Sequence, residues 1–261
     1  MDRVSIIPPS QRRVAHLAAQ NDPEPVLILG EAGTGREGIA RWIHAHSPRA
    51  GLAFVEAHSG EPLHFQAQKA QGGTLLIQEI GEFPLSEQKW IQNVIETRSY
   101  TLPDSPGVRR MLNVRIFATT SRPLETRAEA GFFNSDLLDR LNQSRIEMPP
   151  LRDRRDEFED IVLTLLQELT HTLKKDHVRR FEPEAFAALK DHTWPGNLRE
   201  LRNVLHAAIE STEGDRVQLK DLPNFAEERA EFLSTRAEFQ KLFRTLGLVK
   251  SDDNSTDPNE E

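Results

Sequence analysis

The sequence predicts an α/β domain with a parallel sheet flanked by helices, followed by a small all-helical domain. Up to about residue 150, short apolar runs typical of buried strands alternate with helical patterns, which is the order of elements in a parallel sheet. Beyond that point the strand patterns stop and amphipathic helices follow. The first strand-like run also leads into a glycine-rich turn that opens a helix, as a phosphate-binding loop (P-loop) does.

The predicted strands are five short apolar runs, at 26–29, 54–57, 74–77, 115–119 and 145–148. A helix is predicted at 37–46, where Ile39, Trp42 and Ile43 share one face. A second helix is predicted at 86–98, and its apolar residues at spacings of three and four are Trp90, Ile91, Val94 and Ile95. The rigid Pro149–Pro150 pair closes the fifth strand.

The later part of the chain is predicted to be helical, at 157–174, 184–191, 198–211 and 226–246. Pro183 suits the first turn of the second of these helices, and Asn197 is predicted to be the N-cap of the third. The last eleven residues are polar and acidic, so we expect them to be disordered. The expected division is an α/β core at 1–151, a helical lid at 152–223, a C-terminal amphipathic helix at 224–250 and the acidic tail at 251–261.

Composition excludes several classes of protein. The chain has 261 residues, which is enough for one large domain or two modest ones, and no cysteine. A disulfide scaffold, thiolate catalysis and a cysteine-ligated zinc site are therefore excluded. No apolar run approaches the roughly 18 residues of a membrane span, and the first residues lack the apolar stretch of a secretory signal. We expect a cytoplasmic protein with no membrane partner.

The charge balance argues against direct DNA binding. The net charge is −8, and five of these charges lie in the last eleven residues, which leaves −3 for residues 1–250. That body has no basic block of the kind that nucleic-acid-binding proteins use. The nine histidines form no recognisable metal motif, so no metal site is predicted.

The glycine-rich turn places backbone amides and a helix N-terminus where they can hold phosphate groups. The Walker A pattern ends in Lys followed by Ser or Thr, whereas this loop ends in Arg36 and Glu37. Arginine keeps the positive charge, but its planar fork does not replace an ammonium group cleanly. On the loop alone, a turn without a ligand remains open. The candidate nucleotide-binding residues are Gly30, Glu31, Ala32, Gly33, Thr34, Gly35, Arg36 and Glu37.

Six motifs occur in one order along the chain: GEAGTGREGIARWIHAHSPR, GGTLLIQEIGEFPLSEQ, VRIFATTSRPLE, FFNSDLLDRLN, MPPLRDRRDE and WPGNLRELRNVL. Over about residues 5–223 the chain closely resembles the AAA+ ATPase domain of bacterial enhancer-binding proteins, the sigma-54-dependent activators of the NtrC and phage-shock-activator type. The resemblance implies a doubly wound AAA+ core, a helical lid, an oligomeric ring and ATP at subunit interfaces. It also implies that Arg199, in the sensor II position, reaches the nucleotide.

The resemblance also marks departures at the catalytic positions. The Asp-Glu pair that ends the Walker B strand is replaced by Gln78-Glu79, and an amide is a poor ligand for Mg²⁺. Glu79 keeps the position of the residue that polarises water. The asparagine that hydrogen-bonds this glutamate in the family falls on His58, and sensor I falls on Thr120-Ser121.

The two arginines that act on a neighbouring subunit in the family fall on Asn134 and Arg140, so only the second is kept. An arginine finger is worth about 10³–10⁵ in rate where it acts. The alternative is that Arg140 and Arg199 make only ion pairs between domains.

The segment between the second and third strands is short. Family members carry a long insertion there with the GAFTGA motif, which contacts sigma-54. Here 16 residues, 58–73, separate the two strands, and no GAFTGA-like string is present. Contact with sigma-54 through the usual loop is therefore not expected.

These departures lead to a degenerate AAA+ protein as the main hypothesis. We expect weak or absent ATP binding, little hydrolysis, weakened Mg²⁺ binding, and regulation of transcription by association with itself or with an intact AAA+ relative. The helix at 226–246 is expected to pack or to bind a partner rather than to read DNA. The alternative is a slow ATPase that uses Arg36, Glu79, Arg140 and Arg199, alone or in mixed rings, on a target other than sigma-54.

Overall fold

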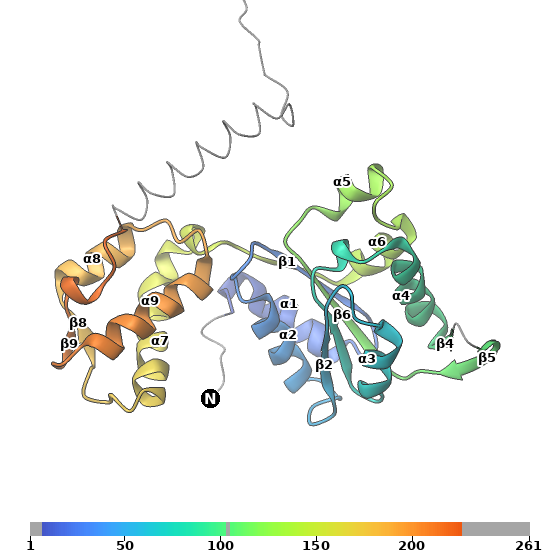
Figure 1. Cartoon of the computed structure of the whole chain (residues 1–261), viewed down its shortest axis with the longest axis horizontal. Coiled ribbons are helices and arrows are strands. Elements are labelled where there is room, and N and C mark those ends of the chain that lie inside the picture. Colours follow the sequence, from blue (N-terminus) through green and yellow to red (C-terminus); the bar gives the residue numbers. More distant parts are fainter. Residues whose placement is uncertain (1–6, 103–104, 226–261) are drawn as a thin grey trace, which may run out of the picture.

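A computed structural model describes the backbone of residues 7–102 and 105–225, and the side chains of these residues outside 102–107 (Figure 1). The predicted helix at 226–246 and the predicted disordered tail lie outside the described residues. Within these residues the chain forms an α/β core and a separate helical lid, which lie side by side in Figure 1. No helix of the described part is long and apolar enough to cross a membrane.

The core is built on a five-stranded sheet in which every neighbouring pair is parallel, in the order β2-β3-β6-β1-β7. The strands are β1 (Val26–Gly30), β2 (Phe54–Ala57), β3 (Thr74–Ile77), β6 (Arg115–Thr120) and β7 (Arg145–Met148). All five predicted strands are confirmed, and β1 and β6 are each one residue longer than predicted. The central strand β6 and its neighbour β3 are buried along their whole length, as expected for a sheet covered on both faces.

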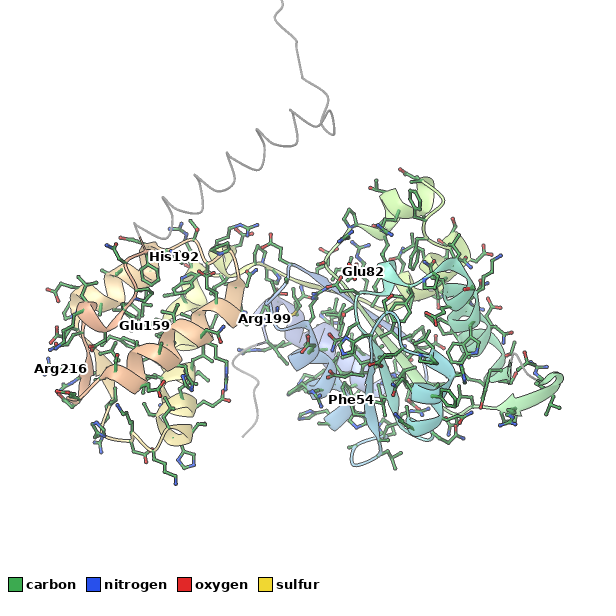
Figure 2. The ribbon with its side chains drawn as sticks, in the orientation of Figure 1. Phe54, Glu82, Glu159, His192, Arg199 and Arg216 are labelled. Carbon is green, nitrogen blue, oxygen red and sulfur yellow. The ribbon has the colours of Figure 1, made fainter. Side chains whose placement is uncertain are left out.

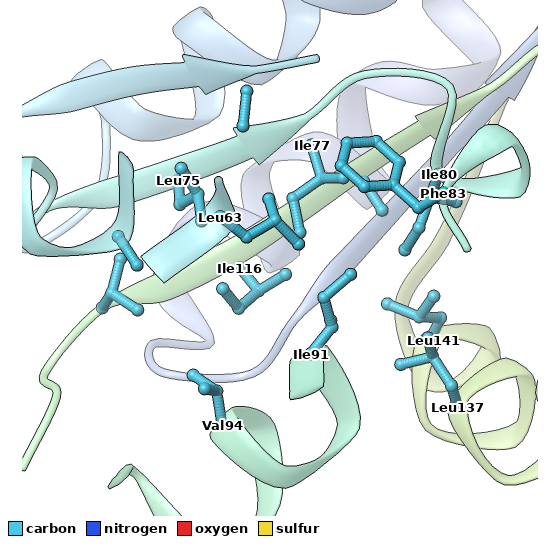
Figure 3. Close-up of a cluster of buried hydrophobic side chains, with 14 of the residues drawn as sticks. Leu63, Leu75, Ile77, Ile80, Phe83, Ile91, Val94, Ile116, Leu137 and Leu141 are labelled. Atoms are coloured by element: carbon cyan, nitrogen blue, oxygen red, sulfur yellow. The ribbon is translucent and has the colours of Figure 1, made fainter. Parts of the chain in front are cut away.

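Helices cover both faces of this sheet. They are α1 (Pro9–Gln20), α2 (Arg36–Ala45), α3 (Leu63–Lys69), α4 (Leu85–Thr97), α5 (Leu124–Glu129) and α6 (Ser135–Leu141). One apolar cluster joins α1 and α2 to the sheet, and another joins α3, α4 and α6 to it. Figure 3 shows part of the second cluster, where Ile91 and Val94 of α4 face Ile116 of β6. The predicted helices α2 and α4 are confirmed to within one residue, whereas α1, α3, α5 and α6 were not predicted.

Two connections lie on the face of the sheet that α3 and α4 cover: the crossover from β2 to β3, and the segment between α4 and β6. The crossover from β2 to β3 contains only the short helix α3. Between α4 and β6, the antiparallel strands β4 (Ser99–Leu102) and β5 (Ser105–Met111) form a hairpin, which was not predicted and which projects from the side of the core away from the lid (Figure 1). Short 3₁₀ turns complete the connections, at Ile80–Glu82, Asn142–Ser144, Leu151–Asp153, Arg155–Glu157 and Leu219–Asp221.

The lid has its own apolar core. Its helices are α7 (Phe158–Thr172), α8 (Pro183–Asp191) and α9 (Asn197–Ser211), close to the predicted ranges. Their buried faces pack around Trp194, which is 1% exposed. The lid is helical as predicted, apart from a two-residue parallel pair, β8 (Arg180–Phe181) with β9 (Arg216–Val217).

Candidate nucleotide-binding site

The loop between β1 and α2 has the backbone geometry of a phosphate-binding loop. Gly33 and Gly35 have φ values of 80° and 96°, which glycine adopts without a steric penalty. Gly35 is the N-cap of α2, and no side chain caps that helix. The first amide groups of a helix have no partner within it, so the N-terminus of α2 offers donors and positive potential to an anion. The hydroxyl of Thr34 donates to the Glu31 carbonyl at 2.8 Å and tightens the loop from within.

Arg36 reaches across the carboxyl edge of the sheet and pairs with Glu79. Its Nη2 donates to Glu79 Oε1 at 2.6 Å, and its side chain is only 11% exposed. The second carboxylate oxygen, Glu79 Oε2, accepts hydrogen bonds from the backbone N–H and the hydroxyl of Ser121, at 2.8 and 3.0 Å. Both oxygens of Glu79 therefore have protein donors, and a water molecule would have to compete with them.

The electrostatics of Glu79 follow from these contacts. Burial alone would raise the pKa of this carboxyl group, but hydrogen bonds from Arg36 and Ser121 and the charge of Arg36 outweigh burial. The net effect holds the pKa of Glu79 below its ordinary value of 4.5. The group is thus an ionised carboxylate held by a cation, which makes it a weaker base than a free glutamate.

Gln78 is tied to the neighbouring strand. Its Nε2 donates to Glu56 Oε2 at 2.8 Å, and the other oxygen of Glu56 pairs with Arg41 at 2.6 Å. Glu56 lies on β2 and Gln78 directly follows β3, which pairs with β2. Among the described residues there is no group of three or more His, Cys, Asp or Glu side chains that could hold a metal ion.

The lid contacts the loop directly, and Asn197 makes several of these contacts. Its side chain accepts a hydrogen bond from Leu151 N at 2.8 Å and donates to the Ala32 carbonyl at 3.0 Å and to Glu31 at 3.2 Å. The prediction that Asn197 caps α9 was wrong, because Gly196 is the N-cap and has no side chain to make the bond. Asn197 instead has a φ of 55°, is fully buried, and joins the lid to the core.

An ion pair adds to this junction. Arg152 donates to both oxygens of Glu31, at 2.6 and 2.8 Å, and holds the pKa of this carboxyl group below its ordinary range. Neither Arg152 nor Glu56 was predicted as a site residue. Arg152 lies in the motif MPPLRDRRDE, but nothing in this motif indicates that Glu31 is its partner.

The predicted residue Arg199 lies at the start of α9, on the side of the lid that faces the core (Figure 2). Its backbone N–H donates to the Gly33 carbonyl at 3.3 Å, and its side chain is exposed. A cavity of about 220 Å³ lies between the loop and the lid, lined by residues including Gly33, Gly35, Arg36, Glu37, Arg199 and Arg202. The second half of the loop, from Gly33, therefore shares one cavity with Arg199, whereas Gly30 and Glu31 line a separate cavity.

The other predicted positions are not brought into this cavity. Arg140 is exposed on α6, and it has no ion-pair or hydrogen-bond partner for its side chain within the described part of the chain. Asn134 caps α6 by accepting from Leu137 N at 3.1 Å, and its amide also donates to Gln92. His58 is exposed, and none of the hydrogen bonds of Glu79 described above comes from it.

Comparison with known families decides the relationship. A family model described as the sigma-54 interaction domain matches residues 5–151, and one described as the AAA+ ATPase lid domain matches residues 152–238. The chain belongs to the sigma-54 interaction domain family. The parallel sheet, the P-loop and the helical lid are those of an AAA+ protein of this family, as the resemblance implied.

Individual relatives of this sigma-54 interaction domain agree with that assignment. The chain is 34% identical over 222 residues to the DNA-binding transcriptional regulator NtrC of Escherichia coli K12, which covers 76% of this chain and 47% of that protein. It is 37% identical over 222 residues to a Geobacillus stearothermophilus protein named limonene hydroxylase, covering 76% of this chain and 40% of that protein. The chain thus spans about half or less of the length of these relatives.

A solved structure resembles the whole described arrangement. NtrX from Brucella abortus in complex with ATP superposes with a TM-score of 0.73 and 27% identity, over 82% of this chain and 52% of that one. The same protein in complex with ADP superposes with a TM-score of 0.74.

Proposed function

We propose that this chain is a degenerate member of the sigma-54-activator type of AAA+ protein, which binds ATP weakly, hydrolyses little and regulates transcription by association. The single observation that carries this proposal is the ion pair between Arg36 and Glu79. In this pair, the cation of the loop, Arg36, and the carboxylate at the Walker B position, Glu79, bind each other.

Nucleotide binding is supported by the loop itself. The residues from Gly30 to Glu37 combine a glycine-rich turn with an uncapped helix N-terminus, and Arg199 lines the same cavity as the second half of this loop. NtrX, the structural relative, has been crystallised with ATP and with ADP. We therefore infer that the loop and Arg199 are the nucleotide-binding residues.

The residues present do not fit a well-held Mg²⁺ ion. Mg²⁺ takes oxygen ligands with near-ideal octahedral geometry. Gln78 uses its amide nitrogen to bind Glu56, and both oxygens of Glu79 have protein donors. No step of the proposed function therefore depends on a bound metal.

The proposed mode of action is association rather than remodelling of sigma-54. Between β2 and β3 the chain has 16 residues, of which seven form α3, so a sigma-54-contacting insertion of the usual length is not expected. The partner would be a second copy of this chain or an intact AAA+ relative. Direct DNA binding is not part of the proposal.

Steady-state ATP hydrolysis tests the proposal. We expect ATP hydrolysis by the wild-type chain to be no faster than ATP hydrolysis in buffer without protein. The turnover numbers of AAA+ motors lie in the usual enzyme range of about 1 s⁻¹ or more. A wild-type turnover in that range would contradict it.

A repaired variant sharpens this experiment. Arg36→Lys would restore the compact cation of the Walker A pattern, and Gln78→Asp would restore the carboxylate. Because an aspartate at 78 would lie beside Glu56, this variant also needs Glu56→Gln to avoid like-charge repulsion. We expect the triple variant to gain hydrolysis that the single variant Gln78→Asp lacks.

A second candidate function rests on Arg140, which is exposed and lacks a side-chain partner within the described residues. An arginine in this state can act on the nucleotide site of a neighbouring subunit. If this chain works in mixed rings, Arg140→Ala lowers the ATP turnover of a mixture with a competent homologue. An unchanged turnover removes this candidate.

A further inference from the structure

The P-loop is held from outside by one turn of the lid, residues 194–200. The Ala32 carbonyl accepts a hydrogen bond from the Asn197 amide at 3.0 Å, and the Gly33 carbonyl accepts one from Arg199 N at 3.3 Å. A trans peptide group is planar, with its C=O and N–H on opposite sides. When the lid holds the carbonyl of Ala32, it also fixes the direction of the Gly33 N–H, away from the lid turn.

The two backbones also touch. A Cβ atom added to Gly33 would lie 2.2 Å from the Gly196 carbonyl oxygen. No side chain fits between Gly33 and Gly196, so a shift of Gly196 shifts the surface against which Gly33 packs. The position of Gly196 therefore matters for the shape of the loop.

Gly196 is itself held by a pair of side chains, Glu200 and His192. Glu200 Oε2 accepts from Gly196 N at 2.7 Å, and Glu200 Oε1 lies 2.8 Å from His192 Nε2. The two side chains are 24% and 11% exposed. Neither residue lines the cavity between the loop and the lid.

The imidazole ring of His192 is fixed by aromatic neighbours. It stacks on Phe225 with ring centroids 4.5 Å apart and meets Trp194 edge-on at 4.7 Å. Figure 2 shows His192 on the lid, on the same side of the lid core as the start of α9. A continuous set of contacts thus runs from His192 through Glu200 and Gly196 to Gly33.

We propose that the lid turn is a template that holds the P-loop in its phosphate-binding conformation, and that Glu200 and His192 are its positioning residues. The consequence for nucleotide binding rests on the proposed function. A loop that is already ordered loses less conformational freedom when a ligand binds, so the template raises affinity without touching the ligand.

Hydrogen exchange of the ligand-free chain tests the template independently of nucleotide. In Glu200→Ala, we expect amide exchange to rise about tenfold at Thr34, whose N–H donates to the Glu31 carbonyl, and at Arg199, whose N–H donates to the Gly33 carbonyl. A tenfold rise is the effect of losing one or two hydrogen bonds of ordinary strength. Glu200→Gln keeps an acceptor for Gly196 N, so it should restore most of the protection. The matched control is Asp215→Asn, which removes an exposed lid carboxylate that pairs with Arg180 at 2.8 Å, far from the loop in sequence.

Unchanged exchange at Thr34 and Arg199 in a folded Glu200→Ala chain overturns the proposal. If exchange in α7 shows that the lid of this variant has unfolded, His192→Ala takes its place, because it removes the partner that orients the Glu200 carboxylate but keeps the acceptor for Gly196 N. Unchanged exchange at Thr34 and Arg199 in His192→Ala would then overturn the proposal.

Titration with a fluorescent ATP analogue gives the second readout. We expect about tenfold weaker binding by Glu200→Ala and no change for Asp215→Asn. If the wild-type chain binds no analogue, the proposed function fails, while the exchange experiment still decides whether the lid turn shapes the loop. If the wild type binds and the exchange rises while affinity stays the same, the role in ligand binding is overturned.

Discussion

At the scale of single residues, Arg36 gives the site a different chemistry from that of a site with the Walker A lysine. A lysine at this position carries a compact charge with three rotatable donors, whereas the guanidinium group is a planar fork that suits carboxylates. Arg36 uses one nitrogen of this fork on Glu79, and its other terminal nitrogen is buried without a hydrogen-bond partner within the described residues. A free buried donor next to a phosphate-binding loop is consistent with binding of an anion.

The pair of Arg36 and Glu79 predicts a pH dependence. Because the folded state lowers the pKa of Glu79, the pair stabilises the fold above the ordinary value of 4.5 and loses this effect as pH falls through the lowered pKa. In Arg36→Met, we expect the pKa of Glu79 to rise and the chain to be about 2 kcal/mol less stable at pH 7. Carbon NMR of the Glu79 carboxyl group and urea unfolding at several pH values measure both effects.

The difference in unfolding free energy between wild type and Arg36→Met should shrink below pH 4.5. Arg122→Met serves as a control, since its ion pair with Glu82 is largely exposed. A difference that stays constant down to strongly acidic pH would show that the pair does not titrate as proposed.

Gly33 gives a second prediction at this scale. Gly33→Ala combines a left-handed backbone with a clash against Gly196, so we expect a loss of about 2–4 kcal/mol in unfolding free energy. Gly131→Ala is the matched control, because Gly131 has a φ of 76° but open space around its Cβ position. Its expected cost is the backbone strain alone, about 1–2 kcal/mol. Equal losses in thermal or chemical unfolding would show that the lid turn does not press on the loop.

At the scale of elements, Asn134 occupies a position that is catalytic in the family but has a structural role here. Its side chain caps α6 and binds Gln92 of α4. We expect Asn134→Arg, which restores the arginine of the family, to destabilise the chain by about 1 kcal/mol through loss of the cap. Asn134→Ser keeps a capping oxygen and should cost less. Chemical unfolding measures both, and an Asn134→Arg chain as stable as wild type would contradict the capping role.

The elements also show what local pattern can and cannot reveal. The strands β1, β3 and β6 were predictable because buried parallel strands are continuous apolar runs. The hairpin β4–β5 was missed because its strands are polar and irregular, and α3 because it has only seven residues. The strands β8 and β9 have two residues each, so they are too short to show a hydrophobic periodicity.

The site was predictable in position but not in its contacts. The sequence places Gln78 and Glu79 directly after one strand and Arg36 at the start of the helix that follows the loop after another. Parallel strands bring these ends to one edge of the sheet. The hydrogen bond from Gln78 to Glu56 depends on the register of β2 against β3, which no local pattern encodes. The role of Asn197 depends on how the lid meets the core, so its favourable capping chemistry was misleading.

At the scale of the whole molecule, the described chain combines a P-loop core with a lid that already contacts the loop. The junction includes the ion pair of Glu31 with Arg152 and the buried side chain of Asn197. Relatives such as NtrC are about twice as long as the matched part of this chain. The proposed weak nucleotide binding rests on this arrangement, in which Gln78 and Glu79 are engaged with other side chains.

The magnesium dependence of ATP binding tests this central claim most directly. Titration of the wild-type chain with a fluorescent ATP analogue, in EDTA and in excess Mg²⁺, compares the two dissociation constants. Because Gln78 and Glu79 are both engaged by protein groups, we expect weak binding with constants that agree within about threefold, a difference below 1 kcal/mol. Binding that tightens about tenfold or more with Mg²⁺ would contradict it.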